Sequence, residues 1–282
     1  MANNLKTILL LGLLTGIILF IGSFWGQQGL TIALVMSIIM NFASYFFSDK
    51  IALRMYRAQA VAREQAPQLY RILDFLCARS GIPMPKVYII PDESPNAFAT
   101  GRNPQHASVA VTEGALRLLN EEEITGVLAH EISHVKNRDI LISSVAATMA
   151  GIIMWVANMA RFAAFFGGGR DRDDEGGGAL GGLVTIIVAP IAAMLIQMWI
   201  SRTREYQADA SAAEVVGSPN GLASALQKLE NYSKRIPMEA SPSTAHMLIM
   251  HPFSGGSLMS LFSTHPSTQK RIARLMGRSS HP

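Results

Sequence analysis

The sequence predicts a mainly α-helical integral membrane protein, with four transmembrane helices and an α+β domain that contains a small sheet. Charged residues are only 16% of the 282 residues and hydrophobic residues are 49%, so a large share of the chain is expected to avoid water. Residues 7–48 contain no charged residue, and further apolar segments occupy residues 140–166 and 179–200. At about 20 residues per crossing, the first stretch is long enough for two helices and each later segment for one.

The first apolar stretch is interrupted at residues 26–29, which read Gly-Gln-Gln-Gly. This break predicts two helices, over residues 7–25 and 30–48, joined by a tight turn. A cleaved signal peptide is the alternative interpretation. It is disfavoured because a second apolar helix follows at once and no small-residue cleavage site precedes soluble sequence. Residues 7–48 are therefore expected to form a transmembrane hairpin.

The second apolar pair flanks a linker at residues 167–178. Residues 140–166 contain one charged residue, Arg161, and residues 179–200 contain none. The linker is rich in glycine and in charge, so we expect it to be flexible and solvated. Two buried helices of a soluble domain are the alternative. The length of the segments and their scarcity of charge favour a second transmembrane hairpin over residues 140–200.

Basic residues flank the expected helices mainly on one side. One precedes the first helix, four follow the second and two follow the fourth (Lys6; Lys50, Arg54, Arg57 and Arg63; Arg202 and Arg204). The positive-inside rule makes this side cytoplasmic. Residues 49–139 and 201–282 then share one side of the membrane and are expected to build one cytoplasmic domain.

Part of this domain shows clear secondary-structure patterns. Residues 65–80 have the pattern of an amphipathic helix that ends at Gly81. Residues 86–90 and 107–111 have the composition of strands. Residues 96–100 are read equally well as a loop or as a short extended segment, which would form a hairpin with 107–111 at the edge of a small sheet.

Composition also excludes several kinds of site and partner. The single cysteine, Cys77, excludes an internal disulfide and a thiolate zinc cluster, and it fits a reducing compartment. A net charge of +4 is too small, in a membrane protein, to indicate nucleic acid. Lysines and arginines beside apolar segments are topology signals instead, and no nucleic-acid partner is expected.

A metal-binding pattern lies just before the third apolar segment. His130 and His134 are four residues apart, so on a helix they share one face and both imidazoles can reach one metal ion. Glu131 then stands beside the metal, where it can handle protons. Asn120 and Glu123 form a capping-box pattern that starts this helix. Two surface histidines on an amphipathic helix remain the alternative.

Two histidines do not complete a catalytic zinc site, which usually takes three protein ligands. Glu205 and Asp209 again share one helical face, although a solvated helix start that is salt-bridged to neighbouring arginines is the commoner reading of such spacing. The membrane topology favours Glu205 as the third ligand. His134 lies six residues before Ile140, where the third helix begins, and Glu205 lies five residues after Ile200, where the fourth ends. Both groups are then within about 10 Å of the same membrane face.

These motifs resemble the HtpX family of bacterial membrane zinc metalloproteases, which are related to the CAAX prenyl endopeptidases. The matching stretches are His-Glu-Ile-Ser-His at 130–134 running on to Asn-Arg-Asp at 137–139, the segment 201–209, and Asn-Ala-Phe-Ala-Thr-Gly at 96–101. The four-helix layout matches as well, so the resemblance covers nearly the whole chain.

The resemblance implies a zincin-like α+β catalytic domain with one Zn²⁺ per chain. It implies that the metal ligands are His130, His134 and Glu205, and that Glu131 is catalytic. It implies further that Asp209 is a partner of a ligand histidine, and that His265 and Arg271 form the pair that contacts the scissile carbonyl. Residues Asn96, Ala97, Phe98, Ala99 and Thr100 would be an edge strand that pairs with extended substrate.

The function implied is a zinc-dependent endopeptidase that cleaves unfolded or misfolded membrane proteins, in membrane protein quality control and the stress response. Zinc would activate a water molecule, Glu131 would take its proton, and zinc with His265 would stabilise the oxyanion. The expected location is the bacterial inner membrane, multi-pass, with the catalytic domain on the cytoplasmic side and with the bilayer and protein or peptide substrates as partners. The alternative is a zinc-stabilised membrane binding or chaperone-like protein without proteolysis.

Overall fold

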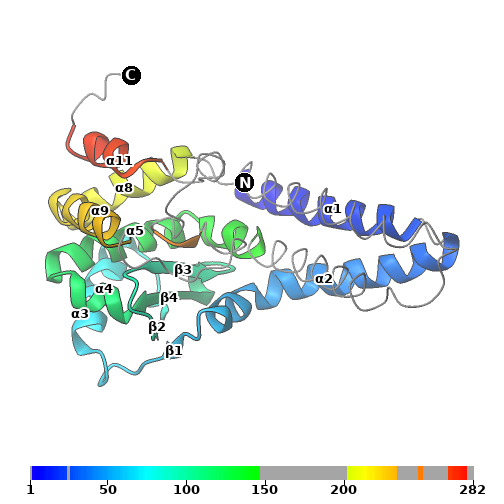
Figure 1. Ribbon diagram of the computed structural model, residues 1–282, viewed down its shortest axis with the longest axis horizontal. Coiled ribbons are helices and arrows are strands. Elements are labelled where there is room, and N and C mark those ends of the chain that lie inside the picture. The colour runs from blue at the N-terminus through cyan, green and yellow to red at the C-terminus, as the bar shows by residue number, and fades with distance from the viewer. Residues whose placement is uncertain (1, 24–25, 147–201, 234–246, 250–265, 278–282) are drawn as a thin grey trace, which may run out of the picture.

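A helical hairpin projects from a domain of helices and a small sheet (Figure 1). In this computed structural model the described residues are 2–23, 26–146, 202–233, 247–249 and 266–277. The hairpin consists of α1 (Ala2–Ser23) and α2 (Gly26–Met55), and α2 continues into the domain.

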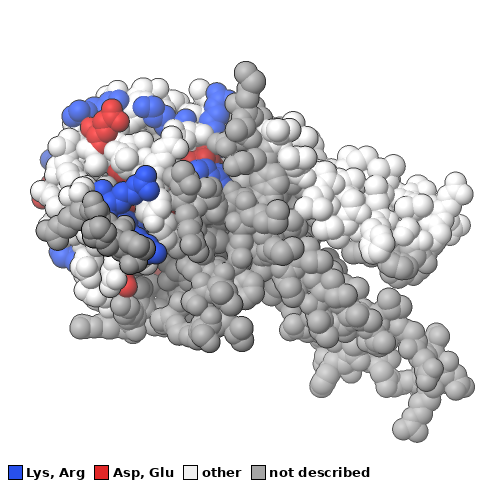
Figure 2. Space-filling view, turned by 90° about the horizontal axis from the view of Figure 1, so that it is seen from above, with Lys and Arg blue, Asp and Glu red and all other residues white. Residues whose placement is uncertain are grey.

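Apolar side chains cover the outside of this hairpin. Ile8 is 65% exposed, Phe20 67% and Ile38 61%, and the face drawn in Figure 2 shows no charged side chain on the projecting helices. The two helices are tied together by a hydrogen bond of 2.8 Å from Asn41 Nδ2 to Thr15 Oγ1. Among the described helices, α2 alone meets the length and hydropathy expected of a membrane span, and only 17% of its apolar window is buried.

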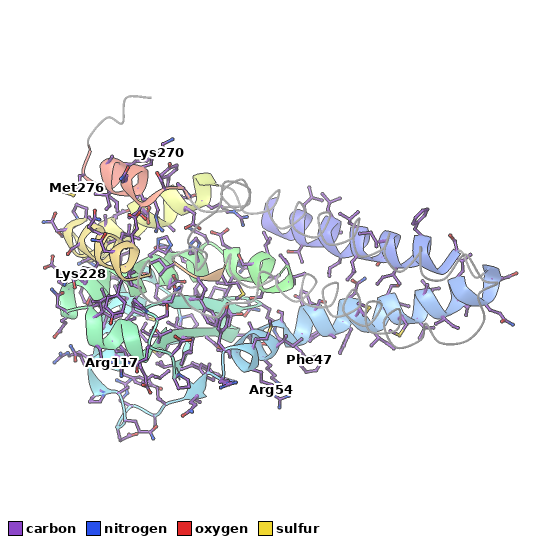
Figure 3. The ribbon with its side chains drawn as sticks, in the orientation of Figure 1. Phe47, Arg54, Arg117, Lys228, Lys270 and Met276 are labelled. Atoms are coloured by element: carbon purple, nitrogen blue, oxygen red, sulfur yellow. The ribbon has the colours of Figure 1, made fainter. Side chains whose placement is uncertain are left out.

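The expected helix boundaries in the hairpin are wrong in two places. Residues 26–29 are helical rather than a turn, because a glycine costs a helix only about 1 kcal/mol and two glutamines cost little. The second helix also does not end at residue 48 but runs on to Met55. Its last turns are stabilised by burial of Ala52 and Leu53 in the domain. Figure 3 marks this transition with Phe47 on the exposed apolar part and Arg54 beside the sheet.

The sheet has four strands in the order β1-β2-β4-β3, with β2 and β4 parallel and the other pairs antiparallel. The strands are β1 (Gln59–Ala60), β2 (Lys86–Ile90), β3 (Ala97–Gly101) and β4 (Ala107–Thr112), with a short 3-10 turn at Pro104–His106. For residues 96–100 the sequence favours neither a loop nor an edge strand. The pairing of β3 with β4 at the sheet edge confirms the strand.

The helix α5 (Glu121–Lys136) lies across the sheet and packs against α3 (Pro67–Ser80), α8 (Arg202–Val216) and α9 (Asn220–Ser233) (Figure 1). Two further helices lie beside them: α4 (Glu113–Leu118) contacts β4, and α11 (Thr268–Leu275) contacts α8 and α9. Both predicted helix ends are confirmed. Asn120 and Glu123 form a reciprocal capping box at the start of α5, and Gly81 ends α3 with a left-handed φ of 69°.

The sheet is packed on both faces, because successive residues of a strand point to opposite sides. Ala97 and Ala99 face the core that contains α3, α5 and α9. Phe98 faces the other way and clusters with Leu53 and Tyr56 at the end of α2. The sheet is therefore held between α5 and the end of the long apolar helix.

Most of the expected second hairpin lies outside the described residues, including the linker 167–178 and the segment 179–200. Its beginning is described: residues 139–146 are helical. Leu141 and Val145 there form a buried cluster with Leu14 of α1. The start of this segment thus packs against the first helix of the projecting hairpin.

The crossing of α5 and α9 depends on Gly126. A Cβ atom at this position would lie 2.5 Å from the backbone nitrogen of Leu222, and backbone atoms cannot move aside as a flexible side chain can. We therefore expect Gly126→Ala to cost about 1–3 kcal/mol by overpacking, despite the better helix propensity of alanine. The check is the thermal unfolding midpoint of the detergent-purified protein. Gly12→Ala is the matched control, because a Cβ there meets nothing within 4 Å; equal midpoints for the two variants would contradict this reading.

Candidate metal centre

The first two side chains of the site come from one turn of α5. His130 and His134 stack edge to face, with ring centroids 4.7 Å apart and planes at 87°. Their Nε2 atoms are 3.2 Å apart. Two imidazole nitrogens at this distance, one on a buried and one on a half-buried ring of the same face of α5, form two corners of a compact site.

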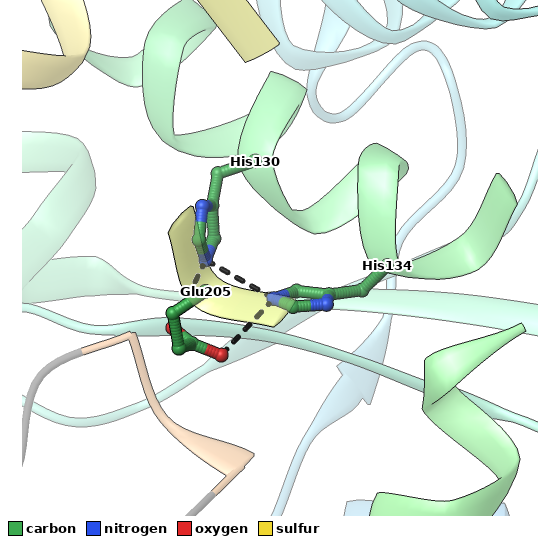
Figure 4. A group of neighbouring side chains, drawn as sticks. All are labelled: His130, His134 and Glu205. Atoms are coloured by element: carbon green, nitrogen blue, oxygen red, sulfur yellow. Dashed lines mark hydrogen bonds and ion pairs between the residues drawn. The ribbon is translucent and has the colours of Figure 1, made fainter. Parts of the chain in front are cut away.

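Glu205 supplies the third corner from α8, whose packing on α5 brings it to histidines that lie 71 and 75 positions earlier in the chain (Figure 4). Its two carboxylate oxygens lie 3.6 Å from His130 Nε2 and 3.5 Å from His134 Nε2. In a tetrahedral zinc site with bonds of about 2.0–2.1 Å, ligand atoms lie about 3.4 Å apart. The three groups can therefore hold a metal ion, and the chemistry and spacing of their donor atoms fit zinc.

A buried charge pair holds His130 in place. Its Nδ1 lies 2.9 Å from Asp209 Oδ1, so Nδ1–H donates to the carboxylate and Nε2 is turned toward Glu205. Arg271 of α11 clamps Asp209 with two bonds of 2.6 and 2.9 Å. Burial opposes ionisation of Asp209, but the Arg271 charge prevails and lowers its pKa to about 2. Burial and Arg271 also oppose protonation of His130, but hydrogen bonds to Asp209 and Glu205 outweigh them and raise its pKa to about 9.

The partner of the second histidine, Asp139, and the arginine that binds Asp139 in turn were not assigned to the site from the sequence. His134 Nδ1 lies 3.3 Å from Asp139 Oδ2, and Arg204 Nη1 donates to Asp139 Oδ1 at 3.3 Å. Burial opposes ionisation of Asp139, but its hydrogen bond to His134 outweighs burial and lowers the pKa of the Asp139 carboxyl group. Asp139 follows His134 by five residues and Arg204 directly precedes Glu205, and both lie in stretches that carry the family resemblance, which is the signal that could have identified them.

Glu131 lies beside the three donor groups and is only 3% exposed to solvent. Burial raises the pKa of its carboxyl group above the ordinary range. One of its oxygens accepts a hydrogen bond of 2.9 Å from the backbone N–H of Ala99 in β3. The helix that carries the histidines is thus bonded directly to the edge strand of the sheet.

The predicted substrate-binding residues lie where an edge strand requires them. Asn96 precedes β3 and its side chain accepts from the N–H of Ala97, while Ala97, Phe98, Ala99 and Thr100 belong to the strand. Thr100 is also tied to the helical residues after α5, through a bond of 2.7 Å to Ser144 Oγ. Of the expected downstream pair, Arg271 is buried against Asp209, and His265 lies outside the described residues.

A small cavity of about 30 Å³ opens at the metal corners. One wall consists of Ala99, Glu131, the two histidines and Glu205, and another consists of residues 247–249. No pattern in the sequence indicates that residues 247–249 come to the site. They are nearly fully buried, and the N–H of Ile249 donates to the C=O of Ala97 at 3.1 Å.

Comparisons with known proteins agree with this geometry. The model of peptidase family M48 matches residues 63–279. Two proteins named "Protease HtpX homolog" are similar over 98% of this chain. That of Desulforapulum autotrophicum is 58% identical, with 90% of it covered, and that of Syntrophobacter fumaroxidans is 56% identical, with 99% covered.

A solved structure shares the fold. The crystal structure of S. mikatae Ste24p aligns with a TM-score of 0.51 at 19% identity, over 97% of this chain and 65% of the Ste24p chain. The family inferred from the sequence motifs is confirmed by these matches. The chain belongs to peptidase family M48, together with the HtpX homologues, and is a metal-dependent peptide hydrolase.

Proposed function

We propose that this protein is a zinc endopeptidase of the membrane whose metal is held by His130, His134 and Glu205. The observation that carries the proposal is the juxtaposition of these three donors with the buried carboxyl group of Glu131. Three protein donors leave a fourth position for water, which is the pattern of catalytic rather than structural zinc. The non-proteolytic alternative would need a fourth protein ligand, and the donor cluster found among the described residues has three members.

Each polar residue around the donors has a proposed part in hydrolysis. Bound zinc supplies Lewis acidity, which lowers the pKa of water and polarises a carbonyl group. Glu131 accepts the proton of the attacking water and returns it to the leaving amine, and its raised pKa suits a base that works near neutral pH. Asp209, clamped by Arg271, fixes the ring of His130 so that Nε2 faces the metal. His265 keeps its expected part, contact with the oxyanion, as a prediction.

The edge strand suggests how substrate is bound. A peptide added to β3 over residues 96–100 would be held mainly through its backbone, so sequence choice would be broad. Such recognition suits unfolded or misfolded membrane proteins, because extended segments are exposed only when a protein is not folded. A part in membrane protein quality control follows from this preference and is in line with the HtpX homologues.

The chain is proposed to cross the bacterial inner membrane four times. The hairpin 7–48 and the segments 140–166 and 179–200 would span it, and residues 49–139 and 201–282 would form the cytoplasmic catalytic domain. Two observations support this. The hairpin exposes many large apolar side chains, which water would penalise. The helical residues 139–146 also pack against α1, beside the membrane-facing helices.

Glu131→Gln tests the proteolytic mechanism. The amide keeps the size of the side chain but accepts no proton, so we expect the variant to retain its zinc and to lose at least about 100-fold in kcat, the usual worth of general acid–base catalysis. The measurements are zinc content and cleavage of fluorescein-labelled β-casein by detergent-purified protein, with and without EDTA. The control is Glu122→Gln, an exposed position on the same helix. A Glu131→Gln protein that still cleaves casein would exclude Glu131 as the base.

Asp139→Asn tests the proposed support of His134. The amide keeps an acceptor oxygen but loses the negative charge, which weakens the bond that orients the imidazole, and we expect zinc affinity to fall by about 10–100-fold. Zinc release to a competing chelator measures this directly. Asp74→Asn removes an exposed carboxylate that is paired with Arg63 and should leave the affinity unchanged. Equal affinities in the two variants would show that Asp139 does not support the metal.

The orientation is testable with introduced thiols, since the native Cys77 is buried. Gln27→Cys places a thiol at the far end of the hairpin, and Lys228→Cys places one on α9 of the domain. In intact bacterial cells whose outer membrane has been permeabilised, a membrane-impermeant maleimide should label position 27 only. Labelling of position 228 under the same conditions would reverse the proposed orientation.

A further inference from the structure

We propose that residues 247–249 close the substrate-binding edge of β3, and that this segment leaves the edge before a peptide is cleaved. The proposal rests on the proposed function, because it concerns access to the same metal centre. It starts from the hydrogen-bonding groups that an edge strand presents to an incoming peptide.

The open edge of β3 is defined by its pairing with β4. The N–H of Thr112 donates to the C=O of Asn96, and hydrogen-bonded and non-bonded pairs alternate along an antiparallel ladder. The backbone groups of Ala97, Ala99 and Gly101 therefore point away from β4. These are the groups with which an added strand would pair.

Most of these outward groups are already engaged. The C=O of Ala97 accepts from Ile249 N–H at 3.1 Å, and the N–H of Ala99 donates to Glu131 at 2.9 Å. The N–H of Gly101 donates to Ser144 Oγ at 3.4 Å. A substrate strand cannot take its place on this edge while Ile249 and Glu131 hold it.

Buried side chains and backbone hydrogen bonds both anchor residues 247–249. Leu248 is fully buried, in the same cluster as Phe98 of β3 and Leu53 at the end of α2. The C=O of Ile249 accepts a bond of 3.3 Å from Arg271 Nη1. Residues 247–249 thus lie against the edge in a turn conformation rather than as a fifth strand, with buried side chains and one backbone bond to β3.

Closure also limits the space at the metal centre. The cavity between the donors and residues 247–249 has a volume of about 30 Å³, which is room for one or two water molecules and not for a peptide.

Pairing of a substrate with the opened edge would also affect Glu131. A peptide carbonyl that takes the N–H of Ala99 frees the Glu131 carboxylate for the attacking water, so substrate pairing and release of the base are one event.

Hydrogen exchange tests the closure without altering the segment. The protein is the full-length Glu131→Gln variant in detergent, which binds substrate but does not turn it over, and the probe is β-casein. We expect saturating casein to speed hydrogen exchange of the Ile249 amide by about tenfold. This factor corresponds to an open form that rises from about one tenth of the molecules to nearly all of them. Amides in the buried turns of α9 serve as the control and should not change. Casein that binds, measured by fluorescence anisotropy, but leaves the Ile249 amide unchanged or more protected would overturn the proposal.

Leu248→Ala tests the same idea by kinetics. Removal of the buried anchor favours the open form, so KM for casein should fall, by up to about tenfold for an open population of about one in ten. Leu226→Ala is the matched control, an equally buried leucine in α9 whose loss should affect stability but not KM. A higher KM for Leu248→Ala than for Leu226→Ala would mean that the segment is part of the substrate-binding wall, and would overturn closure.

The two proposals fail in different ways. If the unaltered protein shows no EDTA-sensitive cleavage of casein, the zinc endopeptidase assignment fails. If it cleaves casein but exchange at Ile249 does not speed up, or if KM of Leu248→Ala does not fall below that of Leu226→Ala, closure alone fails.

Discussion

The hydrogen bond between His130 and Asp209 is the interaction on which the rest of the metal centre depends. It joins α5 to α8, and Arg271 of α11 completes the network around the ionised Asp209. Removal of one member of such a buried charge pair costs about 3–5 kcal/mol, because the remaining charge has no partner. The same network that fixes the ring of His130 also sets α8 in the position from which Glu205 faces both histidines.

The edge strand β3 connects this network to the rest of the molecule. On one face of the sheet it contacts α5, and its Ala99 N–H binds Glu131. On the other face, Phe98 packs into the cluster at the end of α2, the long apolar helix. Residues 247–249 lie in the same place, with Leu248 in the α2 cluster and Ile249 bonded to β3. The proposed substrate-binding edge, the buried carboxyl group of Glu131 and the long apolar helix therefore meet at one strand.

Local signals in the sequence were sufficient for most elements of the fold. The capping box of α5, the glycine end of α3 and the alternating strands involve residues close together in the chain, and the structure agrees with each. The hairpin boundaries were predicted less well. Residues 26–29 carry typical turn composition, but they are helical, and α2 extends to Met55 because its end is buried against the sheet. Burial of this kind comes from distant residues, which a local pattern does not contain.

The candidate metal-binding groups could be predicted from the sequence: two histidines at helical spacing, an adjacent glutamate and, through the topology of the apolar segments, Glu205. Their surroundings could not be predicted, because they arise from tertiary packing. The bond of Asp139 to Arg204 spans 65 positions and that of Ala97 to Ile249 spans 152, and no periodicity relates such residues. The physical reason is that helical spacing is fixed by local backbone geometry, whereas these contacts exist only after α5, α8 and β3 have packed together.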